Sequence, residues 1–352
     1  MLNFIGILFL ICAVHGAALK SNIPEFAKKL AGDELISYVN LNQKLWAAQK
    51  SKFTNEQKRS RANHKRFIKP HDDTVESPIM ANIPEFFDAR EHWPNCPTIG
   101  RIRDQSDCGS AAHFVAVEIA SDRTCIVSNG TFNLPLSPED ALGCCVGEFS
   151  ACGDGWGCDG SWPADILKFW ISHGLVTGGD YYDQTGCQPY SIYPCGANKY
   201  QPDGSTAPPV CPGYHTPKCL HECVSNNTTS WPIPYKDDKH FGKNHYKIAK
   251  KMEAIQTEIM TNGPVIASFI LYDDFYDYKS GVYVHTAGDE YGGMVLKIIG
   301  WGVENSVPYW LCAMQWGDDY GDKGYVKFLR AVNECGIEHQ VIAGMPNLDK
   351  HN

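Results

Sequence analysis

Three stretches of the chain differ in how their apolar residues are spaced, and each spacing predicts a different element. Between residues 24 and 46 the spacing is roughly helical, which predicts a helix, at Phe26, Leu30, Leu35, Ile36, Val39 and Leu45. Residues 111–120 are almost wholly apolar, as in a helix buried on all sides, and we expect that helix to end at Asp122 and Arg123. From residue 265 onward, short apolar runs between Gly-rich turns predict strands, at Val265–Leu271, Val282–Val284, Met294–Trp301, Tyr309–Met314 and Tyr325–Leu329.

Polar and cysteine-rich stretches separate these patterns. Residues 50–69 are polar and basic, which is typical of a solvated linker and, in a secreted precursor, of a segment that processing proteases cut. Residues 144–223 are rich in Cys, Gly and Pro, so we expect disulfides rather than a large core to hold them, with one short helix at Asp165–Ile171. Helices in the first half and antiparallel strands in the second predict an α+β fold.

The N-terminus has the pattern of a secretory signal. An apolar run from Leu2 to Val14 is followed by the small residues Gly16, Ala17 and Ala18, and it is too short for a comfortable membrane span. An uncleaved anchor is the alternative. No other stretch is long and apolar enough to cross a bilayer, so we expect a secreted or lysosomal protein.

Fifteen cysteines fit an oxidising compartment. Cys12 leaves with the signal, and we expect the other fourteen to be mainly disulfide partners. Cys219 and Cys223 have a spacing seen in zinc sites, but no His pair follows at finger spacing, so we expect no metal and no cofactor. Sequons mark candidate glycosylation sites at Asn129, Asn226 and Asn227, and we do not expect the adjacent two to be modified together.

The formal net charge of −9 is unevenly distributed. Residues 20–82 hold 12 Lys and Arg against 7 Asp and Glu, whereas the rest of the chain holds 19 against 33. An acidic main body argues against a nucleic-acid partner, because phosphates need basic patches. A basic front segment suits an intramolecular partner, although both sets of charges can equally be solvated.

Phrases along the chain resemble cathepsin B-like members of the papain family. Residues 33–40 followed by Trp46 resemble the prosegment of those enzymes, and Ile83–Arg90 resembles the start of their mature domain. The other matching phrases are Cys96–Ile99, Ile102–Gln105, Gln188–Ile192, Tyr235–His240, Tyr278–Tyr283, Gly300–Asn305 and Cys335–Glu338. The resemblance implies a signal peptide at 1–16, a prosegment at 17–82 and a papain-like domain at 83–352. That fold has two lobes, a helical left lobe with a central helix and a right lobe like an antiparallel β-barrel.

The catalytic positions of the family are substituted here. Papain-type enzymes carry Cys-Gly-Ser-Cys-Trp at the start of the central helix, where helix N–H groups favour a thiolate. Ala111 stands in place of the second Cys of that motif. The family's His in Gly-Gly-His-Ala is Met294, and its Asn in Ala-Asn-Ser-Trp is Met314. The resemblance therefore implies a protein without papain-type peptidase chemistry, a pseudoprotease.

The resemblance also assigns roles around the cleft. Gln105 matches the oxyanion-hole side chain, and a purely structural amide is the equal alternative. Trp316 matches an aromatic on the leaving-group side, Gly160 one of two substrate-facing glycines and Ser161 the other, and Gln340 an acidic residue of the second substrate pocket. The segment 195–198 has neither of the two His of the family's occluding loop, so we do not expect carboxydipeptidase specificity.

The family's disulfide pattern implies six pairs in this chain. They are Cys96–Cys125, Cys108–Cys158, Cys144–Cys219, Cys145–Cys152, Cys187–Cys223 and Cys195–Cys211. Cys312 and Cys335 are left over, and we expect Cys312 to be a buried, inert thiol. His113 lies close to the lost nucleophile in sequence, but a lone His in an apolar helix is more often packed than catalytic.

We therefore expect a catalytically inactive cathepsin B-like homologue that keeps its cleft for peptides, protease inhibitors or its own prosegment. One alternative is a weakly active or redirected hydrolase that uses Cys312, His113 or another group. A second alternative is a structural or storage protein with a permanently bound prosegment. The oligomeric state and the ligand do not follow from the sequence.

Overall fold

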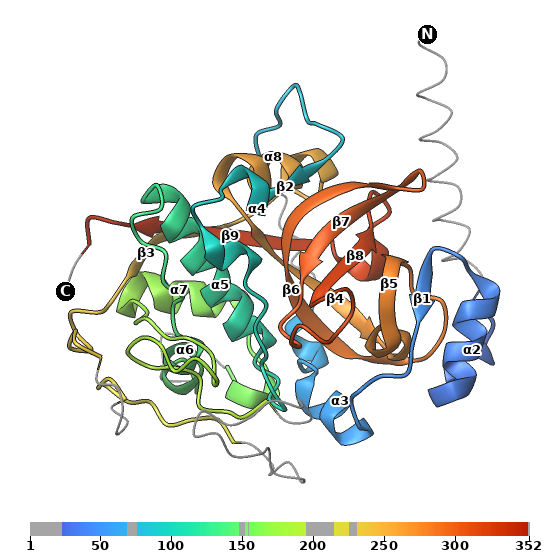
Figure 1. Cartoon of the computed structure of the whole chain (residues 1–352), viewed down its shortest axis with the longest axis horizontal. Helices are drawn as coiled ribbons and strands as arrows, with labels where there is room; N and C mark the ends of the chain where they lie inside the picture. Colours follow the sequence, from blue (N-terminus) through green and yellow to red (C-terminus); the bar gives the residue numbers. More distant parts are fainter. Residues whose placement is uncertain are drawn as a thin grey trace.

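The computed structural model describes residues 23–68, 76–147, 152–153, 155–194, 215–224 and 231–350, and it confirms the predicted two-lobed α+β fold (Figure 1). The helices are α2 (Gly32–Asn42), α3 (Asn55–Arg61), α4 (Ala89–His92), α5 (Ala111–Val127), α6 (Pro138–Cys144), α7 (Pro163–His173) and α8 (Met252–Asn262). The strands are β1 (Trp46–Ala48), β2 (Phe87–Asp88), β3 (Phe241–Lys247), β4 (Val265–Tyr272), β5 (Tyr278–Tyr283), β6 (Glu290–Glu304), β7 (Val307–Ala313), β8 (Tyr325–Leu329) and β9 (Gln340–Asn347). Helices α5, α6 and α7 form one lobe, and strands β4 to β8 lie in the other (Figure 1).

Helix α5 is the core of the helical lobe, as its apolar sequence predicts. It is buried from Ala111 to Cys125. The expected end at Asp122 and Arg123 is wrong, because both charged side chains find buried partners on other elements and the helix continues to Val127. Asp122 lies 2.9 Å from Lys297 Nζ, and Arg123 lies 2.8 Å from Glu258 and donates to two backbone carbonyls. The short helix expected at Asp165–Ile171 lies within α7.

The strands form one continuous sheet in the order β1-β5-β8-β7-β6-β4-β9-β3, and β2 pairs with β6. Strands β5 and β8 are parallel, and the other pairs that the structure describes are antiparallel. The five predicted strands correspond to β4–β8. Strands β1, β2, β3 and β9 were not predicted, because β1 and β2 have only three and two residues and the other two lack a clear apolar alternation.

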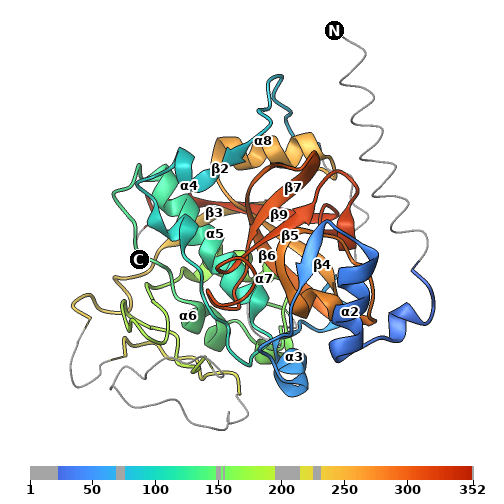
Figure 2. The same ribbon diagram turned by 45° about the vertical axis from the view of Figure 1, so that its right-hand side comes forward.

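The front segment is structured rather than linker-like. The helix predicted up to Trp46 ends at Asn42, and Trp46 begins β1, which adds to the sheet beside β5. The prediction of a solvated linker over residues 50–69 is wrong, since α3 is followed by a 3₁₀ turn at Lys65–Ile68. In both ribbon views α3 lies at the junction of the lobes (Figure 2), and Arg61 is 0% exposed.

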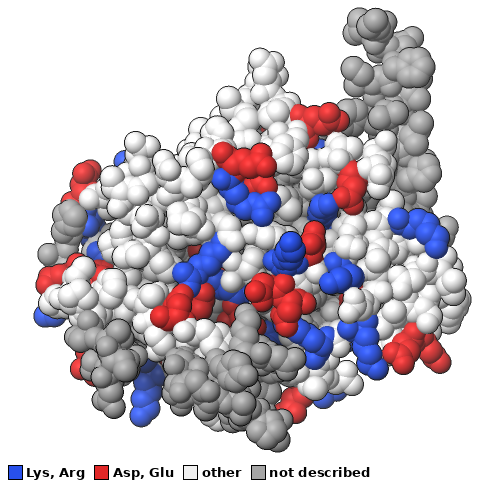
Figure 3. Space-filling model, in the orientation of Figure 1, with Lys and Arg blue, Asp and Glu red and all other residues white. Residues whose placement is uncertain are grey.

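Basic side chains of the front segment pair with acidic side chains of the main body. The pairs are Lys52–Asp319, Lys58–Asp277, Arg61–Asp104, Arg61–Asp107 and Lys65–Glu290. Across the middle of one face, Lys and Arg lie directly beside Asp and Glu (Figure 3). The uneven charge of the sequence is therefore matched, at least in part, within the molecule.

Disulfides hold the segment between α6 and β3. The structure joins Cys96–Cys125, Cys108–Cys158, Cys144–Cys219, Cys145–Cys152 and Cys187–Cys223. The expected Cys195–Cys211 pair lies outside the described residues, as does the expected signal peptide. In the part of the chain that the structure describes, none of the helices is long and apolar enough to span a membrane.

A buried charge cluster connects the two lobes. Lys297 of β6 is 0% exposed, and its Nζ lies 2.9 Å from Asp122 and 3.5 Å from Glu118, both on α5. Burial by itself lowers the pKa of Lys297, but the two adjacent carboxylates raise it above its ordinary value. The ammonium group is therefore charged at neutral pH, and it neutralises charge that the helix brings into the core.

Replacing Lys297 by Ala leaves two carboxylates buried without their partner. We expect Lys297→Ala to lower the free energy of unfolding by about 3–5 kcal/mol, measured by urea denaturation. Lys327→Ala is the control, because the Lys327–Glu304 pair is partly exposed and should cost under about 1 kcal/mol. Equal losses of unfolding free energy in the two variants would show that the buried cluster stabilises the protein no more than a partly exposed ion pair does.

Candidate functional site

The loop before α5 is fixed by its bonds to the segment around Cys158. Cys108 is bonded to Cys158, and Gly109 N donates to the carbonyl of Cys158 at 2.6 Å. A Cβ atom on Gly109 would lie 2.4 Å from that carbonyl oxygen, so only glycine fits this close approach. These contacts place Ala111, which is fully buried, at the first residue of the helix.

Met294 and Met314 come from the other lobe. Met294 lies on β6 opposite Phe269 of β4, Met314 follows β7, and both side chains are buried. Gln315 ties the two segments together, because its Nε2 donates to Val295 O at 2.8 Å and lies 3.5 Å from Met294 Sδ. Helix α5 packs against β6, and all three predicted catalytic positions belong to one core cluster.

The loop before α5 is bonded to this opposite lobe. Gln105 N donates to Gln315 O at 2.9 Å, and Tyr190 Oη donates to Gln105 O at 2.8 Å. The Gln105 side chain donates from Nε2 to Cys108 O at 2.5 Å and to Arg61 O at 3.0 Å. The amide that sequence reasoning assigns either to an oxyanion hole or to structure therefore binds a carbonyl of the front segment.

The front segment crosses the junction of the two lobes, where the cleft lies, at Asn63. Its backbone exchanges two 2.9 Å hydrogen bonds with Gly293. Its side chain accepts from Ser161 N at 3.2 Å and donates to Ser161 O at 3.3 Å. Gly160, at φ 116°, has no room for a Cβ, which would lie 2.0 Å from Asn63 Oδ1. Gly160 and Ser161 therefore face a bound peptide segment, which is here the chain's own.

Aromatic side chains hold this segment at both ends of the cleft. At one end Trp316 stacks on Tyr276 with centroids 5.0 Å apart and meets the edge of Phe53 at 5.5 Å. At the other end Phe67 packs edge-on against Trp156 and Trp162. Trp316 therefore packs against the front segment and is fully buried.

The remaining predicted positions lie elsewhere. Gln340 is half-buried on β9 and lies across β4 from Val295, the neighbour of Met294. Asn129 is exposed just beyond α5, whereas Asn226, Asn227 and residues 195–198 lie outside the described residues.

His113 and Cys312, the candidates for alternative catalytic groups, are both packed in the core. Burial lowers the pKa of His113 to about 3, and its Nε2 lies 3.4 Å from Ser161 Oγ. Burial raises the pKa of the Cys312 thiol well above its ordinary value. Neither environment favours the ionised form that nucleophilic or acid–base catalysis at neutral pH requires.

Sequence reasoning missed the residues of the front segment that fill the cleft, above all Arg61 and Asn63. A signal was available, because Thr54 and Gln57 form a capping box at the start of α3. That motif predicts a helix inside the basic run.

Comparison with known proteins agrees with this geometry. The family model described as "Papain family cysteine protease" matches residues 83–345. Cathepsin B-like cysteine proteinase 5 of Caenorhabditis elegans is 50% identical over 330 residues, covering 93% of each chain. The gut-specific cysteine proteinase of the same organism is 42% identical, covering 96% of this chain and 98% of its own. The solved structure of proCathepsin B S9 from Trypanosoma congolense superimposes with a TM-score of 0.69 at 32% identity, covering 90% of this chain and 98% of its own.

Replacing His113 by Gln tests the buried imidazole. The unfolded chain takes up this proton near the ordinary pKa of 6.5, whereas the folded chain does so only near a pKa of about 3. Stability contributed by this group therefore falls as the pH drops from 7 towards 3. Between pH 7 and pH 5 we expect the unmodified chain to lose about 2 kcal/mol more unfolding free energy than His113→Gln, measured in urea. His339→Gln, at an exposed histidine, should behave like the unmodified chain, and equal losses in all three chains would contradict the expectation.

Proposed function

The chain belongs to the papain family of cysteine proteases, and we propose that it is a cathepsin B-like member that lacks peptidase chemistry and keeps its cleft as a binding scaffold for peptides. One observation carries this proposal. The contacts that shape the cleft are present, while the three positions from which the family draws its catalytic groups hold Ala111, Met294 and Met314.

The chemistry of these side chains supports inactivity. A cysteine protease needs a thiolate, an imidazole that transfers the proton, and a group that orients the imidazole. The methyl group of Ala111 cannot attack a carbonyl, and the thioether of Met294 neither takes up nor releases a proton near neutral pH. In a comparable triad, loss of one key member lowers turnover by roughly 10⁶-fold. We therefore expect almost no papain-type turnover when all three members are replaced.

The alternative of a redirected hydrolase receives no support from the candidate substitutes. His113 contacts Ser161 rather than a thiol, and Cys312 Sγ lies 3.7 Å from the carbonyl oxygen of Trp310. Both side chains are fully buried. Their surroundings are those of packed core residues.

The cleft can hold a peptide without a reaction, since it already holds residues 61–68 of the front segment. Asn63 and Phe67 fill it through backbone pairing, a side-chain amide and aromatic contacts. We infer that other peptides or protease-directed inhibitors use the same contacts when the prosegment is absent. The signal-like N-terminus and the cathepsin B-like relatives favour action in the secretory or lysosomal pathway.

Restoring the family residues tests whether only the chemistry was lost. We expect the triple variant Ala111→Cys, Met294→His, Met314→Asn to gain peptidase activity of roughly 10³-fold or more over the unmodified chain, measured on a fluorogenic peptide after an added protease has trimmed the prosegment. A thiol-reactive peptide warhead should label position 111 of this variant.

Ala111→Cys alone is the matched control, because a thiol without its imidazole should label far more slowly. Warhead labelling or peptide cleavage by the unmodified chain would overturn the proposal of inactivity. Silence of the triple variant, with its fold intact by near-UV circular dichroism, would overturn the proposal of a retained cleft.

The structural or storage alternative predicts that the prosegment stays attached. A binding scaffold needs an open cleft, and this chain is expected to be unable to process itself. We therefore expect N-terminal sequencing of the native protein to give a start near Ile83, made by another protease. A start near Ala17 on all molecules would favour the permanently bound prosegment.

A further inference from the structure

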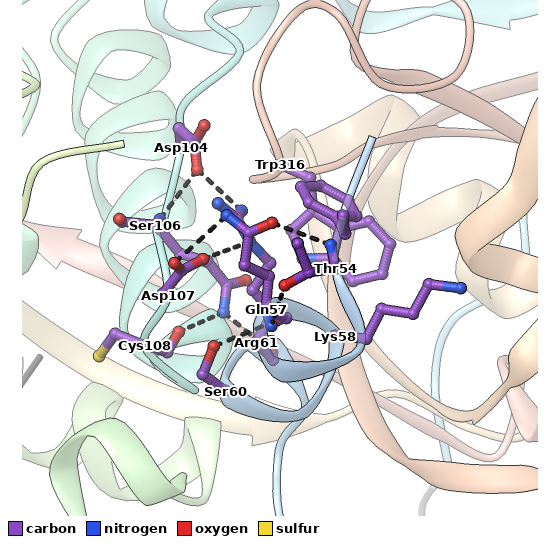
Figure 4. A network of polar contacts seen from close by, with 12 residues as sticks. Thr54, Gln57, Lys58, Ser60, Arg61, Asp104, Ser106, Asp107, Cys108 and Trp316 are labelled. Carbon is purple, nitrogen blue, oxygen red and sulfur yellow. Dashed lines mark hydrogen bonds and ion pairs between the residues drawn. The ribbon is translucent and has the colours of Figure 1, made fainter. Parts of the chain in front are cut away.

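One end of the cleft surrounds a guanidinium group with built-in partners (Figure 4). Arg61, the last residue of α3, is 0% exposed. Its Nη1 donates to Asp104 Oδ1 at 3.0 Å and its Nε donates to Asp107 Oδ1 at 3.2 Å. The carbonyl of the same residue accepts from Gln105 Nε2 at 3.0 Å. Three side chains from residues 104–107 of the domain therefore bind one arginine residue.

We propose that Asp104 and Asp107 form a guanidinium-binding subsite at the Trp316 end of the cleft, which selects arginine in peptides that the cleft holds. This inference rests on the proposed function, because it names the ligand class of the retained cleft. Arg61 is the resident ligand of the subsite in the chain with its prosegment.

The domain positions the backbone that carries both carboxylates. Asp104 Oδ1 accepts from Ser106 N at 2.8 Å, and the backbone of Asp104 bridges to Trp316. Between the carboxylates, Ser106 adopts φ 57°, a left-handed conformation that turns the loop. Asp107 comes immediately before the Cys108–Cys158 disulfide. The loop thus fixes the backbone of both residues and the Asp104 carboxylate, whereas the Asp107 carboxylate accepts from Gln57 and Arg61 of the front segment.

The geometry favours arginine over lysine. The two carboxylates bind two different nitrogens of one planar group, whereas an ammonium is a compact point charge that cannot reproduce this fork. The guanidinium carbon of Arg61 also lies 4.4 Å from the centroid of the Phe53 ring; because Phe53 belongs to the front segment, this cation–π contact is specific to the resident arginine. Arg61 Nη2 is buried and has no hydrogen-bond partner among the described residues. The two carboxylates therefore bind two of the three guanidinium nitrogens of the resident arginine.

The electrostatics of the surroundings point the same way. Burial raises the pKa of the Asp107 carboxyl, and the nearby Arg61 offsets this by favouring its charged form. A hollow of about 180 Å³ next to Asp104 is also lined by Asp318 and Asp319, and Lys52 of the prosegment pairs with Asp319. Without the prosegment, this end of the cleft would present an excess of negative charge that a basic peptide can neutralise.

The experiment empties the subsite in the full chain and offers it small probes. Arg61→Ala removes the side chain beyond Cβ, and ethylguanidinium has the missing shape. We expect ethylguanidinium at millimolar concentration to bind Arg61→Ala saturably in calorimetry and to raise its melting temperature. Butylammonium and ethylurea, which lack the fork or the charge, should bind at least about tenfold more weakly.

Three control chains complete the test. The unmodified chain and Arg61→Met, whose pockets are filled, should not bind ethylguanidinium, and Arg61→Ala with Asp107→Asn should bind it at least about tenfold more weakly than Arg61→Ala. Equal binding of the three probes by Arg61→Ala, or an unchanged affinity after Asp107→Asn, would overturn the subsite. Closure of the emptied pocket in Arg61→Ala, with no probe bound selectively, would overturn the subsite as well.

Folding of each variant is checked by near-UV circular dichroism before titration. If Arg61→Ala does not fold, Arg61→Gly and Arg61→Ser offer the same emptied pocket. These experiments measure binding and not turnover. The absence of selective probe binding would therefore leave the proposal of inactivity standing. Peptidase activity of the unmodified chain would in turn overturn inactivity without affecting the probe ranking.

Discussion

The burial of α5 on all sides from Ala111 to Cys125 is the constraint on which the rest of the structure depends. A helix with no exposed face must find a partner inside the protein for every charged side chain that it carries. Asp122 therefore requires Lys297 on β6, and Arg123 requires Glu258 on α8. These pairs connect the lobes and place the start of the helix between them, where the Cys108–Cys158 disulfide holds the preceding loop. The cleft lies at this junction because the helix begins there.

The same constraint favours apolar residues at the three positions that match the family's catalytic groups. Ala111, Met294 and Met314 are apolar residues in an apolar cluster, so they need none of the hydrogen bonds that buried polar catalytic groups require. Methionine adapts its shape to irregular space, and Gln315 provides the polar contacts between the neighbouring strands. The three positions therefore pack as core residues, and none of them belongs to the charge pairs that connect the lobes.

The basic front segment is not one electrostatic unit. Arg61 is fully buried between two carboxylates, whereas the Lys65–Glu290 pair has both side chains about half exposed. Solvent and salt screen the exposed pair, while the buried guanidinium depends on its partners. Seating of the front segment therefore depends on buried contacts of Arg61, Asn63 and Phe67, and the largely buried Lys58–Asp277 pair adds to them.

Local pattern alone determined much of this protein. The buried helix at 111–120, five of the strands and the α+β class follow from apolar spacing, because side chains on a helix or strand repeat with a fixed period. The residues at positions 111, 294 and 314 are legible from the sequence for the same local reason, since each stands inside a recognisable phrase. Tertiary structure decided what no local period encodes. Asp122 and Arg123 continue a helix that the pattern ends, and a basic run that is typical of a solvated linker becomes a helix in the cleft. Both outcomes depend on partners far away in sequence, Lys297, Asp104 and Asp107, because a charged side chain is buried only where folding brings an opposite charge to it.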